Sequence, residues 1–399
     1  MRLLCIYDGE WPRGATRARK ATIVLAGAGH EIDLISRNAE NAPTRLLEPW
    51  MRVWRLPRIP GRALRYALNF PLFINPVWLL TIWRVMRITR PELILVCDLP
   101  LAPCAIWFGR AFRIPVHYDM GEIYPEFLRS VRLLERQGPL KRLIRAPKLA
   151  EWVERYVLRR TAAVYVVSVE SRDRCVKLGV PPERLVVVGN TPESVAELRA
   201  PQPPPPGIAD LVRDEREILL FVGILIADRG VVDVIRALPD IQARRPKAAL
   251  VIVGDGPERP ALERTAEQLG LESSVRLVGW RVPKDLPAFY QAGHIGLLPF
   301  RDSPHVRLTL ANKLFDYMGA GLPVLGSDLP PIRRVLLETG GGRLYEPDNP
   351  ADLARVAADM LEDLPGRRAM QARGRHAADT VYSWERDAER LREAATRLR

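Results

Sequence analysis

The chain has 399 residues, of which 47% are hydrophobic and 27% charged, and its 60 basic and 47 acidic side chains leave a formal net charge of +13. A hydrophobic fraction at the globular average excludes disorder as the main state, and the length predicts roughly two domains. The four cysteines form no CxxC motif and stand beside no His pair, which excludes a disulfide framework and a zinc site.

The chain opens with a short apolar run that ends at Asp8. A secretory signal needs a longer apolar stretch, so the start of the chain predicts a cytoplasmic location.

Short runs rich in Leu, Ile and Val alternate with segments of helical length, a pattern typical of parallel strands covered by helices. In the first half the runs predict strands at residues 3–7, 32–36, 93–97, 116–118, 164–168 and 185–188. In the second half they predict strands at residues 218–222, 250–253, 275–278, 295–298 and 323–325. Each half therefore predicts its own doubly wound α/β sheet of the Rossmann type.

The charge surplus falls entirely in the first half of the chain. Residues 1–200 carry 32 basic and 19 acidic side chains, whereas residues 201–399 carry 28 of each. Within the first half, residues 52–160 hold 20 basic and 8 acidic side chains. Such a basic lobe could face nucleic acid, an anionic membrane or a phosphorylated substrate.

One uncharged segment of eighteen residues, 66–83, lies within this basic region. Its flanking arginines are residues 62, 65, 84, 87 and 90. An apolar, aromatic segment flanked by arginine is typical of a membrane surface, while Pro71 and Pro76 disfavour a single spanning helix. A buried helix with its preceding loop is an equal alternative. No nucleic-acid-binding motif accompanies the charge, so we expect no nucleic-acid partner.

A proline-rich segment separates the two halves. Pro201 and residues 203–206 exclude a helix interior and favour an extended connector. We therefore expect a first domain at residues 1–197 and a second at residues 198–382, facing each other across a substrate cleft. Residues 383–399 begin with a serine suited to cap a helix, and this final helix could pack back on the first domain.

Glycine turns directly follow three predicted strands in the second half, at Gly223, Gly254 and Gly279. The first turn leads through Arg229 to Gly230 and a predicted helix. Free amides at a helix N-terminus beside a cation suit a diphosphate, although a tight connection explains any one such turn equally well.

Lys313 and Asp316 stand three residues apart, so on a helix they share one face. A cation and a carboxylate there could bind phosphate and ribose hydroxyls, and the alternative is a surface ion pair. The chain contains no Asp-x-Asp, GxSxG or GK[ST] motif, which argues against a carboxylate-held metal, a serine hydrolase and a P-loop nucleotidase.

Taken together and in this order, these elements resemble the GT-B glycosyltransferases, specifically the retaining, nucleotide-sugar-dependent family 4, over nearly the whole chain. The marks of the first domain and its linker are AGAGHEI at 26–32, PVHYDMGEIYPE at 115–126 and VVVGNTP at 186–192. Those of the second domain are residues 223–230, 253–256 and 312–324, similar to the family's G-R-L-x3-K-G, V-G-x-G and K-L-x-E-Y-M-A-x-G-x-P-V stretches.

The resemblance implies that the first domain holds the acceptor and the second the nucleotide-sugar. Arg229 and Lys313 would lie near the diphosphate, and Asp316 would take the place of the glutamate that holds the ribose. The site residues implied are Asp119 and Glu122 as catalytic residues on the acceptor side, and Gly223, Arg229, Gly254, Gly279, Trp280, Arg307, Lys313 and Asp316 on the donor side. No metal or cofactor is implied, the nucleotide-sugar being a UDP- or GDP-linked co-substrate.

Three positions depart from the family pattern. Ile224 stands where the family has a diphosphate-binding arginine, Leu308 where it has the first of two glutamates, and Gly121 where many members have a cleft histidine. Arg307 could compensate for Ile224. A GT-B protein that binds nucleotide-sugars but has lost catalysis is therefore the alternative to an active enzyme.

The sequence thus predicts a retaining, metal-independent glycosyltransferase that acts in surface polysaccharide or glycolipid assembly. Because the basic surplus belongs to the acceptor domain, we expect a lipid-linked or saccharide acceptor and an anionic membrane surface as a candidate partner. The expected location is the cytoplasm, at the inner face of the cell membrane.

Overall fold

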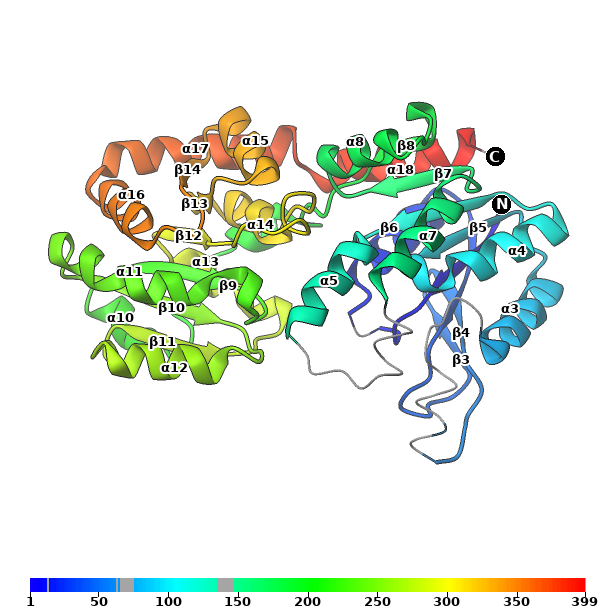
Figure 1. Cartoon of the computed structure of the whole chain (residues 1–399), viewed down its shortest axis with the longest axis horizontal. Helices are drawn as coiled ribbons and strands as arrows, with labels where there is room; N and C mark the ends of the chain where they lie inside the picture. The colour runs from blue at the N-terminus through cyan, green and yellow to red at the C-terminus, as the bar shows by residue number, and fades with distance from the viewer. Residues whose placement is uncertain (13, 62–63, 65–74, 135–145, 399) are drawn as a thin grey trace. The chain divides into compact units, whose positions relative to one another are not determined.

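The computed structural model of the chain describes residues 1–12, 14–61, 64, 75–134 and 146–398 (Figure 1). Residues 66–74 of the uncharged segment, and two of the arginines that flank it, lie outside the described residues. The chain divides into two compact units: unit 1 comprises residues 1–189 and 387–399, and unit 2 comprises residues 190–386.

Unit 1 is built on an eight-stranded sheet with the order β3-β4-β2-β1-β5-β6-β7-β8. Neighbouring strands run parallel except for the edge pair β3 and β4, which is antiparallel. The strands are β1 (Arg2–Tyr7), β2 (Glu31–Ser36), β3 (Arg45–Glu48), β4 (Met51–Arg55), β5 (Leu93–Cys97), β6 (Val116–Met120), β7 (Ala163–Val166) and β8 (Leu185–Val187). The central strands are buried on both faces, as parallel strands covered by helices must be.

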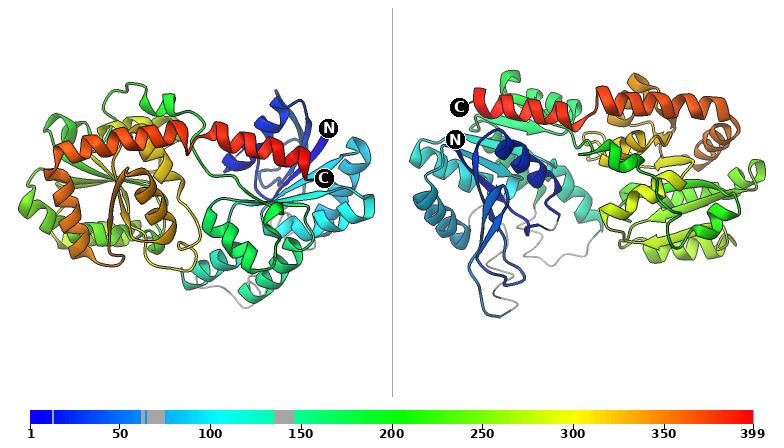
Figure 2. Two further views of the ribbon diagram at one scale, coloured as in Figure 1. Left: turned by 90° about the horizontal axis from the view of Figure 1, so that it is seen from above. Right: turned by 180° about the vertical axis from the view of Figure 1, so that it is seen from behind.

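Helices cover both faces of this sheet. They are α1 (Thr16–Gly27), α3 (Pro76–Thr89), α4 (Ala102–Phe112), α5 (Tyr124–Leu134), α7 (Pro147–Leu158), α8 (Val169–Lys177) and α18 (Trp384–Arg397), with the 3-10 turns η1 (Leu99–Leu101) and η2 (Pro182–Arg184). Right-handed crossovers place α3, α4 and α7 on one face, toward the viewer in Figure 1, and α1 on the other. The view from behind in Figure 2 shows α1 and the final helix α18 on that second face.

Leu398, the residue that follows the final helix α18, contacts the sheet of unit 1. The backbone oxygen of Leu398 lies 2.5 Å from Nε2 of His117 on β6, and Nδ1 of the same ring lies 2.7 Å from the Tyr165 hydroxyl on β7. Burial is the main cause that lowers the pKa of His117 to about 4, so the ring is neutral near pH 7.

Unit 2 is built on a six-stranded, wholly parallel sheet with the order β11-β10-β9-β12-β13-β14. Its strands are β9 (Glu217–Val222), β10 (Ala248–Val253), β11 (Val275–Gly279), β12 (Ile295–Leu298), β13 (Val324–Ser327) and β14 (Gly342–Tyr345). Numbered from its own first strand, this is the order 3-2-1-4-5-6 of a dinucleotide-binding Rossmann fold.

The helices of unit 2 also lie on both faces of its sheet. They are α9 (Val195–Arg199), α10 (Ala209–Arg213), α11 (Val231–Arg244), α12 (Arg259–Gln268), α13 (Leu286–Ala292), α14 (Asn312–Ala320), α15 (Pro330–Thr339), α16 (Pro350–Glu362) and α17 (Leu364–Thr380), with the turns η3 (Ala227–Arg229) and η4 (Pro283–Asp285). One continuous core joins the two helix layers to the sheet.

The prediction of two Rossmann-like α/β sheets is confirmed, and all the predicted strands are present within a few residues of their expected ends. The structure adds β3, β4 and β14. β3 and β14 have four residues each and β4 has five, and arginine or glutamate flanks or interrupts the apolar residues of β3 and β4, so none presents the long apolar run of a central parallel strand.

The strand order identifies one candidate ligand-binding position in each unit, at the carboxyl ends of two neighbouring strands. Connections leave toward opposite faces after β1 and β5 in unit 1, and after β9 and β12 in unit 2. Ligands of doubly wound sheets bind at the carboxyl ends of such neighbouring strands. Across the described residues, no helix combines the length and apolar character needed to cross a membrane.

Candidate functional site

The glycine turns that follow β9, β10 and β11 are joined by backbone hydrogen bonds. Gly223 N–H donates to the Val253 carbonyl at 3.0 Å, and Gly254 N–H donates to the Gly279 carbonyl at 3.0 Å. Gly254 has φ +150°, and a Cβ there would lie 1.8 Å from the Gly223 oxygen. Only glycine permits this approach, so the predicted residues Gly223, Gly254 and Gly279 form one connected rim.

A second connection joins the loops that follow β9 and β12, at the switch point of the sheet. Arg301 N–H donates to the Asp228 carbonyl at 3.0 Å, and the Cζ atom of Arg229 lies 4.4 Å from the centroid of the Phe300 ring. Gly230 is the N-cap of α11, with φ +61°, and a Cβ there would lie 1.9 Å from the Pro299 oxygen. The predicted cation Arg229 therefore stands just before the N-terminus of α11, where backbone amides favour an anion.

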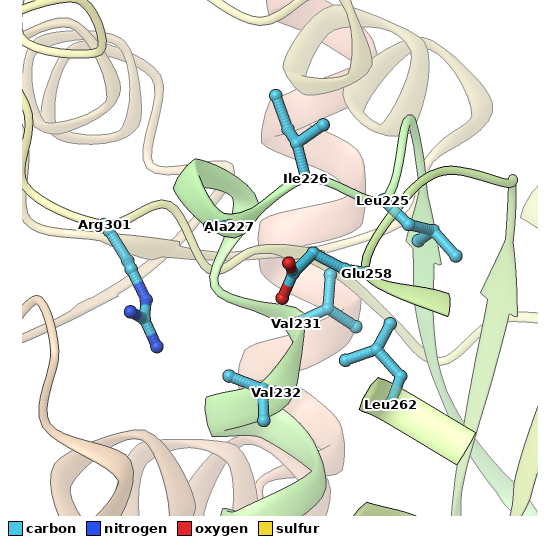
Figure 3. A pocket seen from close by; sticks show the side chains of 8 residues that line it. All are labelled: Leu225, Ile226, Ala227, Val231, Val232, Glu258, Leu262 and Arg301. Atoms are coloured by element: carbon cyan, nitrogen blue, oxygen red, sulfur yellow. The ribbon is translucent and has the colours of Figure 1, made fainter. Parts of the chain in front are cut away.

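A small hollow lies beneath the loop that follows β9 (Figure 3). It is lined by Leu225, Ile226, Ala227, Val231, Val232, Glu258, Leu262 and Arg301. Arg301 is held by Asp233, whose Oδ2 lies 3.2 Å from its NH2 atom. The hollow measures about 30 Å³, enough for one or two water molecules, so it supports the loop and is too small for a sugar nucleotide.

Helix α14 brings together the predicted pair Lys313 and Asp316. Lys313 Nζ lies 2.6 Å from Asp316 Oδ2 and 3.1 Å from the Tyr290 hydroxyl, which itself donates to Asp316 Oδ2 at 3.2 Å. Burial, and then the charge of Asp316, raise the pKa of Tyr290 well above its ordinary value, so its hydroxyl keeps its proton. The three side chains form a closed polar triangle with one cation and one carboxylate.

The next residue of α14 anchors this triangle to β9. The Val222 N–H donates to the Tyr317 hydroxyl at 2.9 Å, immediately before the Gly223 turn. Tyr317 is fully buried, and a Cβ on Gly296 of β12 would lie 2.6 Å from its ring. The pair Lys313 and Asp316 is therefore fixed near the same strand end as the glycine rim.

The other two predicted donor-side residues have different surroundings. Trp280 is 65% exposed and directly follows Gly279, which has φ +82°. Arg307 donates from Nε and NH2 to both carboxylate oxygens of Asp302 at 2.5 Å, at the protein surface. Ile224, at the position of the family's diphosphate arginine, is 53% exposed on the loop after β9.

In unit 1, the predicted catalytic residue Asp119 is bound by an arginine from α1. Arg17 Nε lies 2.9 and 3.0 Å from the two carboxylate oxygens of Asp119, and NH2 lies 2.7 Å from Oδ1. The third nitrogen, NH1, donates to the Val188 carbonyl at 2.9 Å. The carboxylate is 5% exposed, so Asp119 is half of a buried ion pair that connects β6, α1 and the end of β8.

The second predicted catalytic residue, Glu122, is exposed and follows β6 by two residues. Between them, Gly121 lies close to the ion pair: a Cβ there would be 3.4 Å from Asp98 Oδ1 and 3.5 Å from Cδ of Arg17. A side chain as large as histidine at this position would have to be accommodated beside Arg17.

Sequence reasoning missed Asp8 and Asp98, which directly follow β1 and β5 at the switch point of unit 1. Asp98 has φ +65°, and its N–H donates to the Asp119 carbonyl at 3.0 Å. Burial raises the pKa of Asp8 to about 6 against the opposing charge of Arg37. Burial, and then the charges of Asp8 and Asp119, raise the pKa of Asp98 well above its usual range. Their position in the sequence could have identified Asp8 and Asp98, because each directly follows a predicted strand, where ligands of such sheets bind.

Among the described residues, no group of three or more His, Cys, Asp and Glu side chains has a geometry that could hold a metal ion.

Two family models match the chain. The model described as "Glycosyl transferases group 1" matches residues 216–363, and that described as "Glycosyl transferase 4-like domain" matches residues 14–191. Among curated relatives, the 2-deoxystreptamine N-acetyl-D-glucosaminyltransferase of Streptomyces fradiae is 28% identical over 371 residues, covering 88% of this chain and 84% of the relative. With other curated relatives the match spans about half of their length.

Solved structures match over the whole chain. Sucrose-phosphate synthase from Thermosynechococcus elongatus has a TM-score of 0.77 and 18% identity, with 100% of this chain and 99% of that chain covered. HepE from Anabaena, solved in complex with UDP, has a TM-score of 0.72 and 16% identity, with 99% and 100% covered. At such identities the likeness establishes the fold alone.

Proposed function

Because the chain belongs to the group 1 glycosyltransferases of family 4 and has the GT-B fold, we propose that it transfers a sugar, with retention of configuration, from a nucleoside diphosphate sugar. The proposed acceptor is a lipid-linked or other saccharide in surface polysaccharide or glycolipid assembly. The proposed place of reaction is the inner, cytoplasmic face of the cell membrane.

The observation that carries the proposal is the donor-side rim of unit 2. Three glycine turns meet at the carboxyl ends of β9, β10 and β11, and Arg229 precedes the N-terminus of α11. Lys313 adds a second cation from α14, one turn before the anchor at Tyr317. Two cations and a helix N-terminus match a diphosphate, and Asp316 offers an acceptor for ribose hydroxyls. The UDP complex of HepE supports a uridine nucleotide, with a GDP-sugar as the other candidate.

Positive charge beside the diphosphate also supplies the chemistry. Negative charge develops on the leaving diphosphate as the glycosidic bond breaks, and preorganised cations stabilise that charge most in the transition state. We assign this role to Arg229 and Lys313, and expect the reaction to need no metal ion.

The surroundings of Asp119 support retention without an enzyme nucleophile. Both of its carboxylate oxygens already accept hydrogen bonds from Arg17, which leaves the carboxylate poorly suited to attack a sugar. We therefore propose front-face attack by the acceptor hydroxyl, with the leaving phosphate accepting its proton. In this scheme Arg17 and Asp119 position the end of β6, and Glu122 contacts the acceptor.

The experiment that tests the proposal is a panel of UDP- and GDP-linked sugars, with nucleotide release measured in the presence and absence of acceptors. The acceptor panel contains lipid-linked saccharides and also 2-deoxystreptamine, which the name of the Streptomyces fradiae relative suggests. Release that depends on a lipid-linked acceptor supports the proposal. Nucleotide binding without turnover would instead favour the catalytically degenerate alternative.

A further inference from the structure

Exposed tryptophan is concentrated on one helical layer of unit 1. Of the nine tryptophans in the chain, four are exposed, and three of these lie on α3, α4 and α7. Trp83 is 47% exposed, Trp107 59% and Trp152 67%. Tryptophan is a costly side chain to leave in water, so three on one layer indicate a surface that is covered in the working protein.

The three helices are neighbours on the same face of the sheet (Figure 1). Helix α4 packs against α7. The backbone of Asn75, the N-cap of α3, hydrogen-bonds the Cys104 thiol of α4. The exposed tryptophans therefore belong to one continuous layer, here called the α3–α4–α7 face.

Other exposed apolar side chains extend this face. On α3, Leu80 and Trp83 are three residues apart and so are neighbours on the exposed side of the helix, and Ile88 is also exposed near the helix end. Phe112 is exposed at the end of α4.

The exposed charges on this face are all basic. The exposed basic residues within or just after the three helices are Arg84, Arg87, Arg90, Arg110, Arg113, Lys148, Arg155, Arg159 and Arg160. Neither α3 nor α4 contains an acidic residue. On α7, Glu154 is buried against Arg174, and the partly exposed Glu151 forms an ion pair with Arg129.

This combination favours an anionic membrane over the alternatives. Tryptophan prefers the boundary between lipid head groups and hydrocarbon, and arginine beside it meets lipid phosphate. Ring and guanidinium already associate at this face, with Arg87 Cζ 5.6 Å from the Trp83 ring and Arg160 Cζ 4.1 Å from the Tyr156 ring. A nucleic acid would not require the exposed aliphatic side chains Leu80 and Ile88 of α3, and a second copy of this basic face would repel the first.

We propose that the α3–α4–α7 face of unit 1 docks on the surface of a bilayer containing anionic phospholipid. This inference rests on the proposed function, because a lipid-linked acceptor would lie in the same bilayer on which the face docks. The face carries the protein to the membrane by interfacial binding of its tryptophans and by attraction between its arginines and lipid phosphate.

Vesicle co-sedimentation of the full chain tests this inference. The vesicles contain phosphatidylcholine alone, or phosphatidylcholine with about one third phosphatidylglycerol, at low salt. We expect binding to the anionic vesicles only. The double variants Trp107→Ser with Trp152→Ser, and Arg110→Glu with Arg155→Glu, should each weaken it by about tenfold or more.

Matched controls come from exposed residues of unit 2. Leu337→Ser removes an apolar side chain that is 71% exposed, and Arg213→Glu reverses a charge that is 75% exposed. Neither should change vesicle binding. Equal loss in these controls would show a nonspecific effect of apolar area or net charge and would overturn the assignment to this face.

Two further outcomes also count against the inference. Binding to an RNA homopolymer that is unaffected by the Trp→Ser changes, without binding to vesicles, would identify a general polyanion surface. Self-association that is lost in the Trp→Ser variant, again without vesicle binding, would identify a second copy of this chain as the occupant.

The inference and the proposed function fail separately. Nucleotide release with a detergent-solubilised acceptor is measured on the same preparations without vesicles, which also shows that the variants are folded. Transfer without vesicle binding overturns the docking face alone. Vesicle binding without transfer overturns the proposed function and leaves the docking face standing.

Discussion

The guanidinium of Arg17 donates hydrogen bonds to both carboxylate oxygens of Asp119, and its remaining nitrogen donates to the Val188 carbonyl. The residues come from α1, β6 and the end of β8, so one side chain joins three elements at the carboxyl edge of the sheet in unit 1. Because both of its oxygens accept hydrogen bonds from Arg17, the buried carboxylate of Asp119 mainly stabilises the contact between these three elements.

Removing one partner of this pair should be costly. Arg17→Met leaves the 5% exposed carboxylate of Asp119 without its cation, and we expect the free energy of unfolding to fall by about 3–5 kcal/mol in urea titrations. The double variant Arg17→Met with Asp119→Asn should recover much of this loss, because no unpaired charge remains. A double variant as unstable as the single one would contradict the ion-pair account.

Lys313 should matter for turnover. Lys313→Met removes a cation that we assign to the leaving diphosphate, so kcat/KM with the preferred nucleotide-sugar should fall by about 10²–10³. Lys247→Met, an exposed lysine paired with Glu215 at the opposite end of the same sheet, is the matched control and should keep normal kinetics. Equal kinetics for the two variants would exclude Lys313 from the site.

Gly254 should tolerate no side chain. Its φ of +150° and the 1.8 Å approach of a built Cβ to the Gly223 oxygen force the backbone to move, so Gly254→Ala should cost about 3 kcal/mol or more and lower Tm by several degrees. Gly270→Ala, at φ +67° with open space around it, should cost only about 1 kcal/mol. Thermal unfolding followed by circular dichroism measures both.

His117 should make stability depend on pH. Burial lowers its folded-state pKa to about 4, below the unfolded value of 6.5, so the stabilisation is complete above pH 6.5 and is lost as the pH falls toward 4. This difference in pKa corresponds to about 3 kcal/mol in the free energy of unfolding. Urea titrations at several pH values should show this loss in the free energy of unfolding of the wild type, and a smaller dependence on pH in His117→Gln. Subtracting the two curves removes the contribution of the other titrating groups.

The sequence was most informative where a residue acts within its own segment. Apolar runs located the central strands of both sheets, and glycines after those strands located the rim of unit 2, because both signals are local. The spacing of Lys313 and Asp316 placed them on one helix face, and their side chains do meet.

The sequence was least informative where residues meet across the fold. Arg17 and Asp119 are 102 positions apart, and nothing local in either segment indicates their pairing. Tyr290, which completes the triangle with Lys313 and Asp316, comes from a different helix. Asp8 and Asp98 become a pair only through the strand order, which brings β1 beside β5. The exposed tryptophans likewise show their common layer only once α3, α4 and α7 are folded.

The measurement that tests the central claim most directly is the anomeric configuration of the product, followed by NMR during incubation with the UDP- or GDP-sugar that the panel selects, without added metal ion. We predict release of the nucleoside diphosphate and a glycoside with the same anomeric configuration as the donor, with the rate unchanged by a chelator. An inverted product, or no transfer from any nucleotide-sugar with lipid-linked or soluble acceptors, would contradict the proposed retaining transfer.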